Sequence, residues 1–187
     1  MPRLSTILGL TLLLASAGVA GDGQTRDVDG RDRRLFTPWG SANVLLFIGS
    51  DCPVSNGFAP EIRRICDRFA AHGISCFLVY EDIGIDAPRM RAHMAEYGYV
   101  RMPAAIDADR TIARRAGASV TPQAVVIDPG GTVRYRGRIN NFYAALGKPR
   151  QHVTVHDLRD ALEALLAGRP IPNPETEALG CFINTGK

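Results

Sequence analysis

The sequence predicts an α/β sandwich in which helices flank a mixed central β-sheet. Short runs of branched apolar residues, at 44–48 and 74–80, are typical of buried strands. They alternate with segments whose apolar residues recur every three or four positions, as on a helix that packs against a sheet. Farther along, the turn sequence at 128–131 (DPGG) separates two strand-like runs and indicates a hairpin. Strands and helices that alternate and end in a hairpin favour one mixed sheet covered by helices.

The beginning of the chain predicts a secretory signal peptide at residues 1–20. Arg3 precedes an apolar segment at 8–15, and the small residues Gly18-Val19-Ala20 follow it, so we expect cleavage after Ala20. An uncleaved membrane anchor is the alternative, but the segment is short for a bilayer span and is diluted by serine, threonine and glycine. We therefore expect a periplasmic or secreted protein without a stable membrane anchor.

The 167 residues after this leader are enough for one domain, which we place at 21–168, with a C-terminal arm at 169–187. The full chain has a formal net charge of +3, and the leader contributes one arginine and no acid, so the mature chain carries +2. So balanced a charge argues against binding to nucleic acid or to a membrane surface. The sequence has neither haem-attachment nor zinc-finger spacing, and we expect no cofactor and no metal ion.

The elements of the first half follow from periodicity and turn residues. The charged segment 21–34 contains Asp29-Gly30 and predicts one hairpin before the first buried strand. After residue 52, one amphipathic helix is expected to run to His72-Gly73. Two further helices are expected after the 74–80 strand, at 86–97 and 110–116.

The second half predicts a strand at 125–128, its hairpin partner at 132–135, and no strand after them. Thr154 and Asp157 have the spacing of a capping box and open a helix that ends at Gly168. The last segment, 169–187, contains three prolines and no periodicity, so it is expected to lie extended over the surface.

Cys52 occupies the point where the 44–48 strand gives way to a helix. Unpaired N–H groups and the helix dipole at such a point favour the thiolate, which is the nucleophilic form of cysteine. Pro53 suits the first helical position because its φ is fixed near the helical value. Asp51 acts in the opposite direction, since a neighbouring carboxylate disfavours a second anion, so the direction of the pKa shift of Cys52 stays open.

These residues resemble the active-site segment of the thioredoxin superfamily. Cys52 follows an apolar strand and precedes an amphipathic helix, with Pro60 eight residues on, and Ser55 stands at the position of the second cysteine of a CxxC motif. The stretches DCPVSN at 51–56 and FAPEIRRI at 58–65 are similar to exported redoxin-domain proteins of the AhpC/TSA-like group.

Three later stretches carry the same resemblance. Residues 120–122 (VTP) resemble the superfamily's cis-proline loop, which packs beside the reactive cysteine, and 102–107 resemble its short strand. Gly180-Cys181-Phe182-Ile183 is similar to the Gly-Cys-x-Ile ending of the exported group. The resemblance implies a thioredoxin-like fold, catalytic roles for Cys52, Cys181 and Ser55, and substrate-binding roles for Pro53, Thr121 and Pro122.

Cys181 is the candidate resolving thiol. It is far from Cys52 in sequence, but a pliable arm lets it fold back and supply the second thiol that Ser55 does not provide. The alternative is a permanent Cys52–Cys181 staple. Such a bond closes a loop of over a hundred residues, worth about 4 to 5 kcal/mol in the chain-entropy model.

Cys66 and Cys76 fall on the apolar faces of a helix and of the strand after it, and two interpretations stay open. They are either buried small hydrophobes or a structural disulfide. Rises of about 1.5 Å per helical residue and about 3.3 Å per strand residue place both roughly 10 Å from the His72-Gly73 turn. The direction of their Cβ atoms decides between the two.

The predicted function is that of an exported thiol–disulfide oxidoreductase, whose partners are a protein disulfide and an unidentified thiol reductant. Cys52 attacks the substrate disulfide, and the Thr121-Pro122 loop docks the extended partner. A small peroxide is the alternative substrate, through a sulfenic acid on Cys52. Against it, peroxiredoxins have a threonine or serine three residues before the cysteine, where this chain has Gly49. Their matching arginine could come from any of Arg134, Arg136 or Arg138.

A copper-binding or partner-binding module is an alternative of a different class. His152 and His156 are four residues apart and could join cysteines at a copper or zinc site. Because His152 precedes the predicted helix, the two imidazoles need not share a face. Solvated histidines at the start of a helix are the favoured interpretation.

Overall fold

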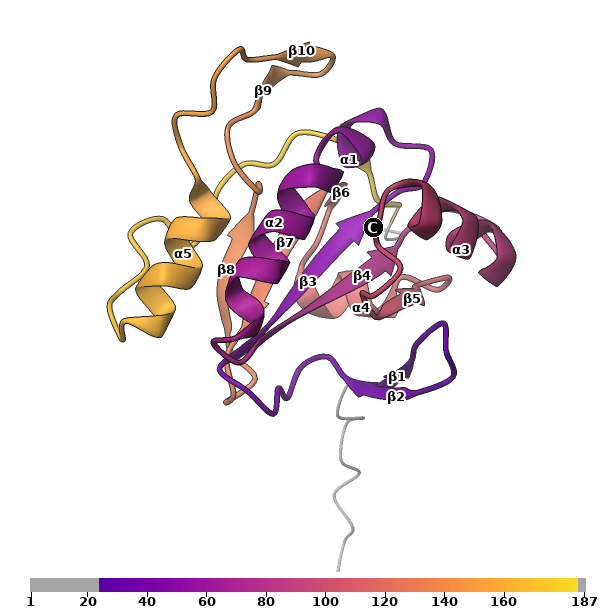
Figure 1. Ribbon diagram of the computed structural model, residues 1–187, viewed down its shortest axis with the longest axis horizontal. Coiled ribbons are helices and arrows are strands. Elements are labelled where there is room, and N and C mark those ends of the chain that lie inside the picture. The colour runs from indigo at the N-terminus through magenta and orange to yellow at the C-terminus, as the bar shows by residue number, and fades with distance from the viewer. Residues whose placement is uncertain (1–23, 185–187) are drawn as a thin grey trace, which may run out of the picture.

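The computed structural model describes residues 24–184, which form a five-stranded mixed sheet with the order β5-β4-β3-β7-β8 (Figure 1). The three strands β3, β4 and β5 are parallel to one another, whereas β7 pairs antiparallel with β3 on one side and with β8 on the other. This arrangement confirms the predicted α/β fold. The bounds are β3 Ala42–Ile48, β4 Ile74–Tyr80, β5 Ala104–Ile106, β7 Gln123–Ile127 and β8 Val133–Gly137.

Helices cover both faces of the sheet (Figure 1). Every residue of β3 is buried because the strand lies at the centre of the sheet, and its side chains alternate between two apolar clusters. One cluster contains residues of α2, α3 and α5, and the other contains residues of α4 together with Leu35 and Phe36. The helices are α2 Ala59–Ala70, α3 Ala87–Glu96, α4 Thr111–Ala116 and α5 Asp157–Leu166.

The helix expected after Cys52 is divided into α1, Pro53–Gly57, and α2, with Phe58 between them. Pro60 explains the division. It has no backbone N–H to bond the carbonyl of Asn56, so the ladder of an uninterrupted helix cannot pass this point. The prediction of one continuous helix was therefore wrong, and only a short helix follows Cys52.

A hairpin that was not expected follows the sheet. Strands β9, Tyr143–Ala145, and β10, Lys148–Pro149, pair across Gly147, whose φ of 70° suits a glycine in a tight turn. The strands are two or three residues long and none of their residues is fully buried, so they have no apolar alternation. The expectation of no further strand was wrong for this reason.

The start of α5 also differs from the expected capping box. His156 is the residue before the helix, and it makes no side-chain cap bond. Thr154 bonds instead to the buried Asn141, whose Oδ1 accepts the Thr154 N–H at 3.0 Å and whose Nδ2 donates to Thr154 Oγ1 at 2.8 Å. The threonine therefore ties the segment before α5 to the loop after β8.

The predicted N-terminal hairpin is present, with β1 Gln24–Arg26 paired to β2 Asp32–Arg34. The buried carboxylate of Asp27 accepts the N–H groups of Asp29 and Arg31 and closes the turn. The predicted signal peptide, residues 1–20, lies outside the described residues. Among residues 24–184, no helix has the length and apolar content to span a bilayer.

Candidate active site

Cys52 lies at the carboxyl edge of the sheet, four residues after β3 ends. Its backbone N–H donates to the carbonyl of Gly49, and its own carbonyl accepts the N–H of Asn56 in the first turn of α1. Pro53 is the first residue of that helix, as the sequence predicts. The Cys52 side chain is buried, with 4% of the residue exposed. The sulfur therefore needs an opening before it can meet a large substrate.

The C-terminal arm brings Cys181 to Cys52. After α5, the arm crosses the molecule (Figure 1), and its strand β11, Cys181–Phe182, pairs antiparallel with β6, Val120–Thr121. The two sulfurs are 2.7 Å apart, with the Cys181 thiol donating toward Cys52. The arm was predicted to be extended and pliable. At its end the arm is extended and is paired as the strand β11.

The loop that joins β6 to β7 completes the site. The Thr121-Pro122 peptide bond is cis. The carbonyl of Thr121 lies 3.2 Å from Cys52 Sγ and accepts a hydrogen bond from the thiol. The structure thus brings together Cys52, Cys181, Thr121 and Pro122, which the sequence marked as site residues from two separate stretches and the arm.

The two sulfurs have pKa values shifted in opposite directions. Burial raises the pKa of Cys52, but hydrogen bonds from Cys181, from the backbone and hydroxyl of Ser55 and from Thr121 outweigh it, so the net pKa is lowered. Burial, the hydrogen bond to Cys52 and the negative charges of Cys52 and Asp82 raise the pKa of Cys181 to about 11. Cys52 therefore loses its proton at a lower pH than Cys181 does.

This difference predicts separate pH profiles for alkylation by iodoacetamide. Only the thiolate reacts, so a lowered pKa lets Cys52 reach half-maximal rate below the usual cysteine range, while Cys181 stays slow until the pH approaches 11. Mass spectrometry of the reduced protein at each pH gives the rate for each cysteine. In the control variant Cys181→Ala, loss of the thiol donor should move the Cys52 midpoint upward. Coincident midpoints, or an earlier one for Cys181, would contradict the assignment.

Ser55 supports the sulfur without a thiol of its own. It is buried, its Oγ accepts the N–H of Gly49 at 3.3 Å, and its backbone N–H and hydroxyl favour the Cys52 thiolate. These local hydrogen bonds lower the pKa of Cys52. The dipole of α1 contributes less than expected, because the helix has only five residues. The structure thus places a hydroxyl beside Cys52 at the position where a CxxC motif has its second thiol.

Asp82 lies at the site, although no motif in the sequence marks it. Its carboxylate accepts the Ser50 N–H at 2.8 Å, the Ser50 hydroxyl at 3.0 Å and the Asp51 N–H at 3.4 Å. It thereby holds the loop that carries Cys52. A signal was present, because Asp82 follows the end of β4, and the carboxyl ends of adjacent parallel strands meet at one edge of a sheet.

Asn56, the last residue of DCPVSN, links the same loop to the core. Its Nδ2 donates to the carbonyl of Ser50 at 2.9 Å, and its Oδ1 faces His93 Nε2 at 2.9 Å. Burial lowers the pKa of His93, so the ring is neutral and one nitrogen donates while the other accepts. Nε2 donates to Asn56, and Nδ1 accepts from the Tyr80 hydroxyl at 2.8 Å. No sequence pattern marks His93 or Tyr80, because their meeting depends on tertiary packing.

Two features bear on peroxide chemistry: the residue three positions before Cys52, which is Gly49, and the three candidate arginines. A Cβ at Gly49 would lie 3.2 Å from the Cys52 Cβ and 3.4 Å from Thr121 Oγ1, so a side chain there would crowd the sulfur. The three candidate arginines each pair with a carboxylate. The pairs are Arg134 with Asp128, Arg136 with Glu175, and Arg138 with Asp157.

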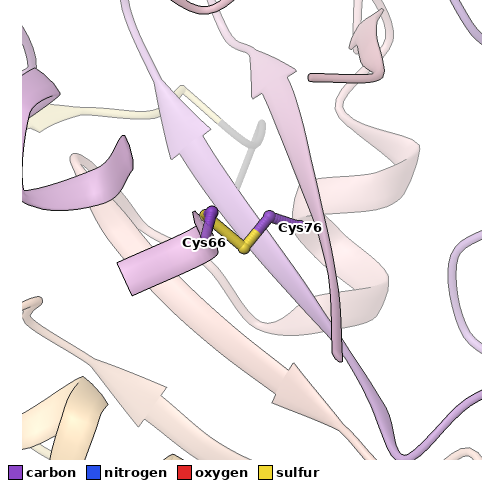
Figure 2. Close-up of a disulfide and its surroundings, with 2 residues drawn as sticks. All are labelled: Cys66 and Cys76. Carbon is purple, nitrogen blue, oxygen red and sulfur yellow. A yellow bond between two sulfur atoms is a disulfide. The ribbon is translucent and has the colours of Figure 1, made fainter. Parts of the chain in front are cut away.

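Cys66, Cys76, His152 and His156 are not among the residues around Cys52 described above. Cys66 on α2 and Cys76 on β4 form a disulfide with Cα atoms 5.9 Å apart (Figure 2). Among residues 24–184, no group of three or more histidine, cysteine or acidic side chains is gathered as a metal site would require. His156 lies at the start of α5, and His152 is exposed.

The chain is similar in sequence to one protein family and in structure to several known proteins. Residues 19–136 match the AhpC/TSA family. An uncharacterized conserved protein from Geobacillus kaustophilus is 26% identical, with 86% of each chain covered and a TM-score of 0.73. A hypothetical protein from Sinorhizobium meliloti is 24% identical, with 88% of this chain and 91% of that chain covered and a TM-score of 0.74.

A more distant solved structure is a secreted Mycobacterium tuberculosis disulfide oxidoreductase homologous to E. coli DsbE. It is 17% identical, with 79% of this chain and 96% of that chain covered and a TM-score of 0.53. No curated protein matches the chain significantly. These likenesses agree with the thioredoxin-like fold.

Proposed function

The chain belongs to the AhpC/TSA family, and we propose that it is an exported thiol–disulfide oxidoreductase in which Cys52 is the nucleophile and Cys181 the resolving thiol. One observation carries this proposal. The two free cysteines, 129 residues apart in sequence, lie with their sulfurs 2.7 Å apart, and their pKa values are split so that one is poised to attack while the other keeps its proton.

The reaction proceeds in two exchange steps. The Cys52 thiolate attacks one sulfur of a substrate disulfide, the S–S bond breaks, and the other substrate sulfur leaves as a thiolate. Cys181 then loses its proton to solvent and attacks the Cys52 sulfur of the mixed disulfide, releasing the second substrate thiolate. The substrate gains two electrons, and the protein keeps a Cys52–Cys181 disulfide. A thiol reductant of unidentified structure restores the pair by the reverse exchange.

A protein disulfide is the substrate class that fits these groups. Exchange needs a low-pKa sulfur and a backbone edge for an extended peptide, which Cys52, once uncovered, and the Thr121-Pro122 loop supply. The M. tuberculosis protein of similar fold is described as secreted and as a disulfide oxidoreductase, which supports both the reaction class and a periplasmic or secreted location for this chain.

The choice between disulfide and peroxide predicts a difference in rate. We expect the reduced protein to lose its Cys52 thiol faster to a peptide disulfide than to hydrogen peroxide at equal concentration, because Gly49 provides no hydroxyl to polarise the O–O bond. Stopped-flow measurement on Cys181→Ala isolates the first step for both oxidants. A peroxide rate far above that of a free thiol of similar pKa would favour a peroxidase instead.

A further inference from the structure

The C-terminal arm forms the same kind of contact with β6 that an extended substrate would make. Cys181 is in register with Thr121, Phe182 is in register with Val120, and the Ile183 N–H donates to the Ser119 carbonyl at 2.9 Å. The pairing is antiparallel, and it places a cysteine of the arm directly against Cys52. The backbone edge beside the reactive sulfur is therefore already occupied by the chain itself.

Two residues of the arm fix this docking. A Cβ on Gly180 would overlap the backbone carbonyl of Thr121, so the close approach of arm and loop requires a glycine. Ile183 is 7% exposed and packs in the apolar cluster on the α4 face of the sheet. Phe182 lies between them in sequence but is 91% exposed, since alternate side chains of a strand point in opposite directions.

The docked arm also blocks the path of attack. In the exchange, the Cys52 sulfur attacks one sulfur of the substrate disulfide, so that substrate sulfur must come next to Cys52. In the docked structure the Cys181 sulfur lies next to Cys52, at 2.7 Å. Cys52 itself is 4% exposed. A protein disulfide cannot reach the Cys52 sulfur and pair with Thr121 while β11 remains in place.

We propose that the arm and the substrate strand occupy the same edge of β6 in turn, so that exchange proceeds by strand replacement. This inference rests on the proposed function. The arm leaves β6, the substrate segment pairs with Thr121, and the Cys52 thiolate displaces one substrate sulfur as a thiolate. The arm then returns, Cys181 loses its proton to solvent and attacks the Cys52 sulfur, and the second substrate sulfur departs as a thiolate.

The test compares two disulfides on variants that stop after the first step. The base variant is Cys181→Ser, which keeps the arm but cannot resolve the mixed disulfide. Adding Gly180→Val or Ile183→Asp should undock the arm, through the overlap with Thr121 or through the loss of apolar burial. Adding Phe182→Ala is the matched control on the same strand. The probes are an extended ten-residue peptide disulfide-bonded to glutathione and the small 2-hydroxyethyl disulfide.

The measured quantity is the ratio of the peptide rate constant to the small-disulfide rate constant. Both probes meet the same Cys52 thiolate, so any change in its pKa cancels in the ratio. We expect the ratio to rise about tenfold in both undocking variants, which corresponds to ~1.4 kcal/mol of docking free energy, and to stay constant in Phe182→Ala.

Three results would overturn the proposal in distinguishable ways. Equal acceleration of both probes would mean that the arm only covers the sulfur and does not compete for the β6 edge. Unchanged rates in both undocking variants would mean that the arm does not restrict access at all. If neither the base variant nor the two undocking variants form a mixed disulfide with either probe, the proposed function itself fails, and strand replacement fails with it.

Discussion

Replacing Cys52 with serine should abolish thiol–disulfide exchange. A serine hydroxyl is not ionised near neutral pH and has no comparable nucleophilicity, so the second-order rate constant with a peptide disulfide should fall by at least on the order of a thousandfold. Stopped-flow measurement with the peptide disulfide checks this, and circular dichroism verifies the fold. Residual activity within tenfold of the wild type would mean that another residue attacks the substrate.

Cys181→Ser is the companion variant, and it should separate attack from resolution. Its first step should survive because Cys52 is unchanged, but the mixed disulfide should accumulate, since no second thiol lies at 2.7 Å to displace the substrate. Mass spectrometry detects the added peptide on Cys52. In oxidised wild-type protein, differential alkylation and peptide mapping should find Cys52 joined to Cys181. Full turnover by Cys181→Ser would remove the resolving role.

Removing the Cys66–Cys76 disulfide should cost about 2 to 3 kcal/mol of unfolding free energy. The bond joins α2 to β4 across a sequence separation of 10, and closing a loop of this size lowers the entropy of the unfolded chain by roughly that amount. Urea unfolding of Cys66→Ala/Cys76→Ala against oxidised wild type measures the difference from the midpoint and slope of each curve. The same comparison in a Cys52→Ala/Cys181→Ala background is the control, because no Cys52–Cys181 bond can add to the stability of either protein there. Equal midpoints for the Cys66→Ala/Cys76→Ala variant and the wild type would show that the bond adds no stability.

The sequence predicted those parts of the candidate site that depend on local sequence patterns. The apolar run that becomes β3 and the amphipathic spacing of α2 placed Cys52 at the edge of a sheet, and the comparisons agree with the fold that these patterns predicted. The order of the elements in the chain, the turn residues and the apolar periodicity were enough to predict β3 and α2.

The remaining features depend on packing between distant segments, which no local pattern reports. Asp82 holds the loop at Ser50 because β4 lies beside β3, and His93 meets Asn56 only after α3 has packed against the sheet. The β9–β10 hairpin could not be predicted, because its short strands have no buried residues and no apolar alternation. The docking of Cys181 as a strand depends on the free edge of β6, which the sequence alone does not show.

The Cys66–Cys76 bond also determines how many electrons the folded chain can exchange. Although the sequence holds four cysteines, the closed bond leaves Cys52 and Cys181 as the two free thiols. The folded protein is therefore a carrier of a single electron pair, and only one further disulfide can form within it. A partner that donates one electron pair restores the two thiols of Cys52 and Cys181. No other free cysteine is present with which either of them could form a wrong disulfide.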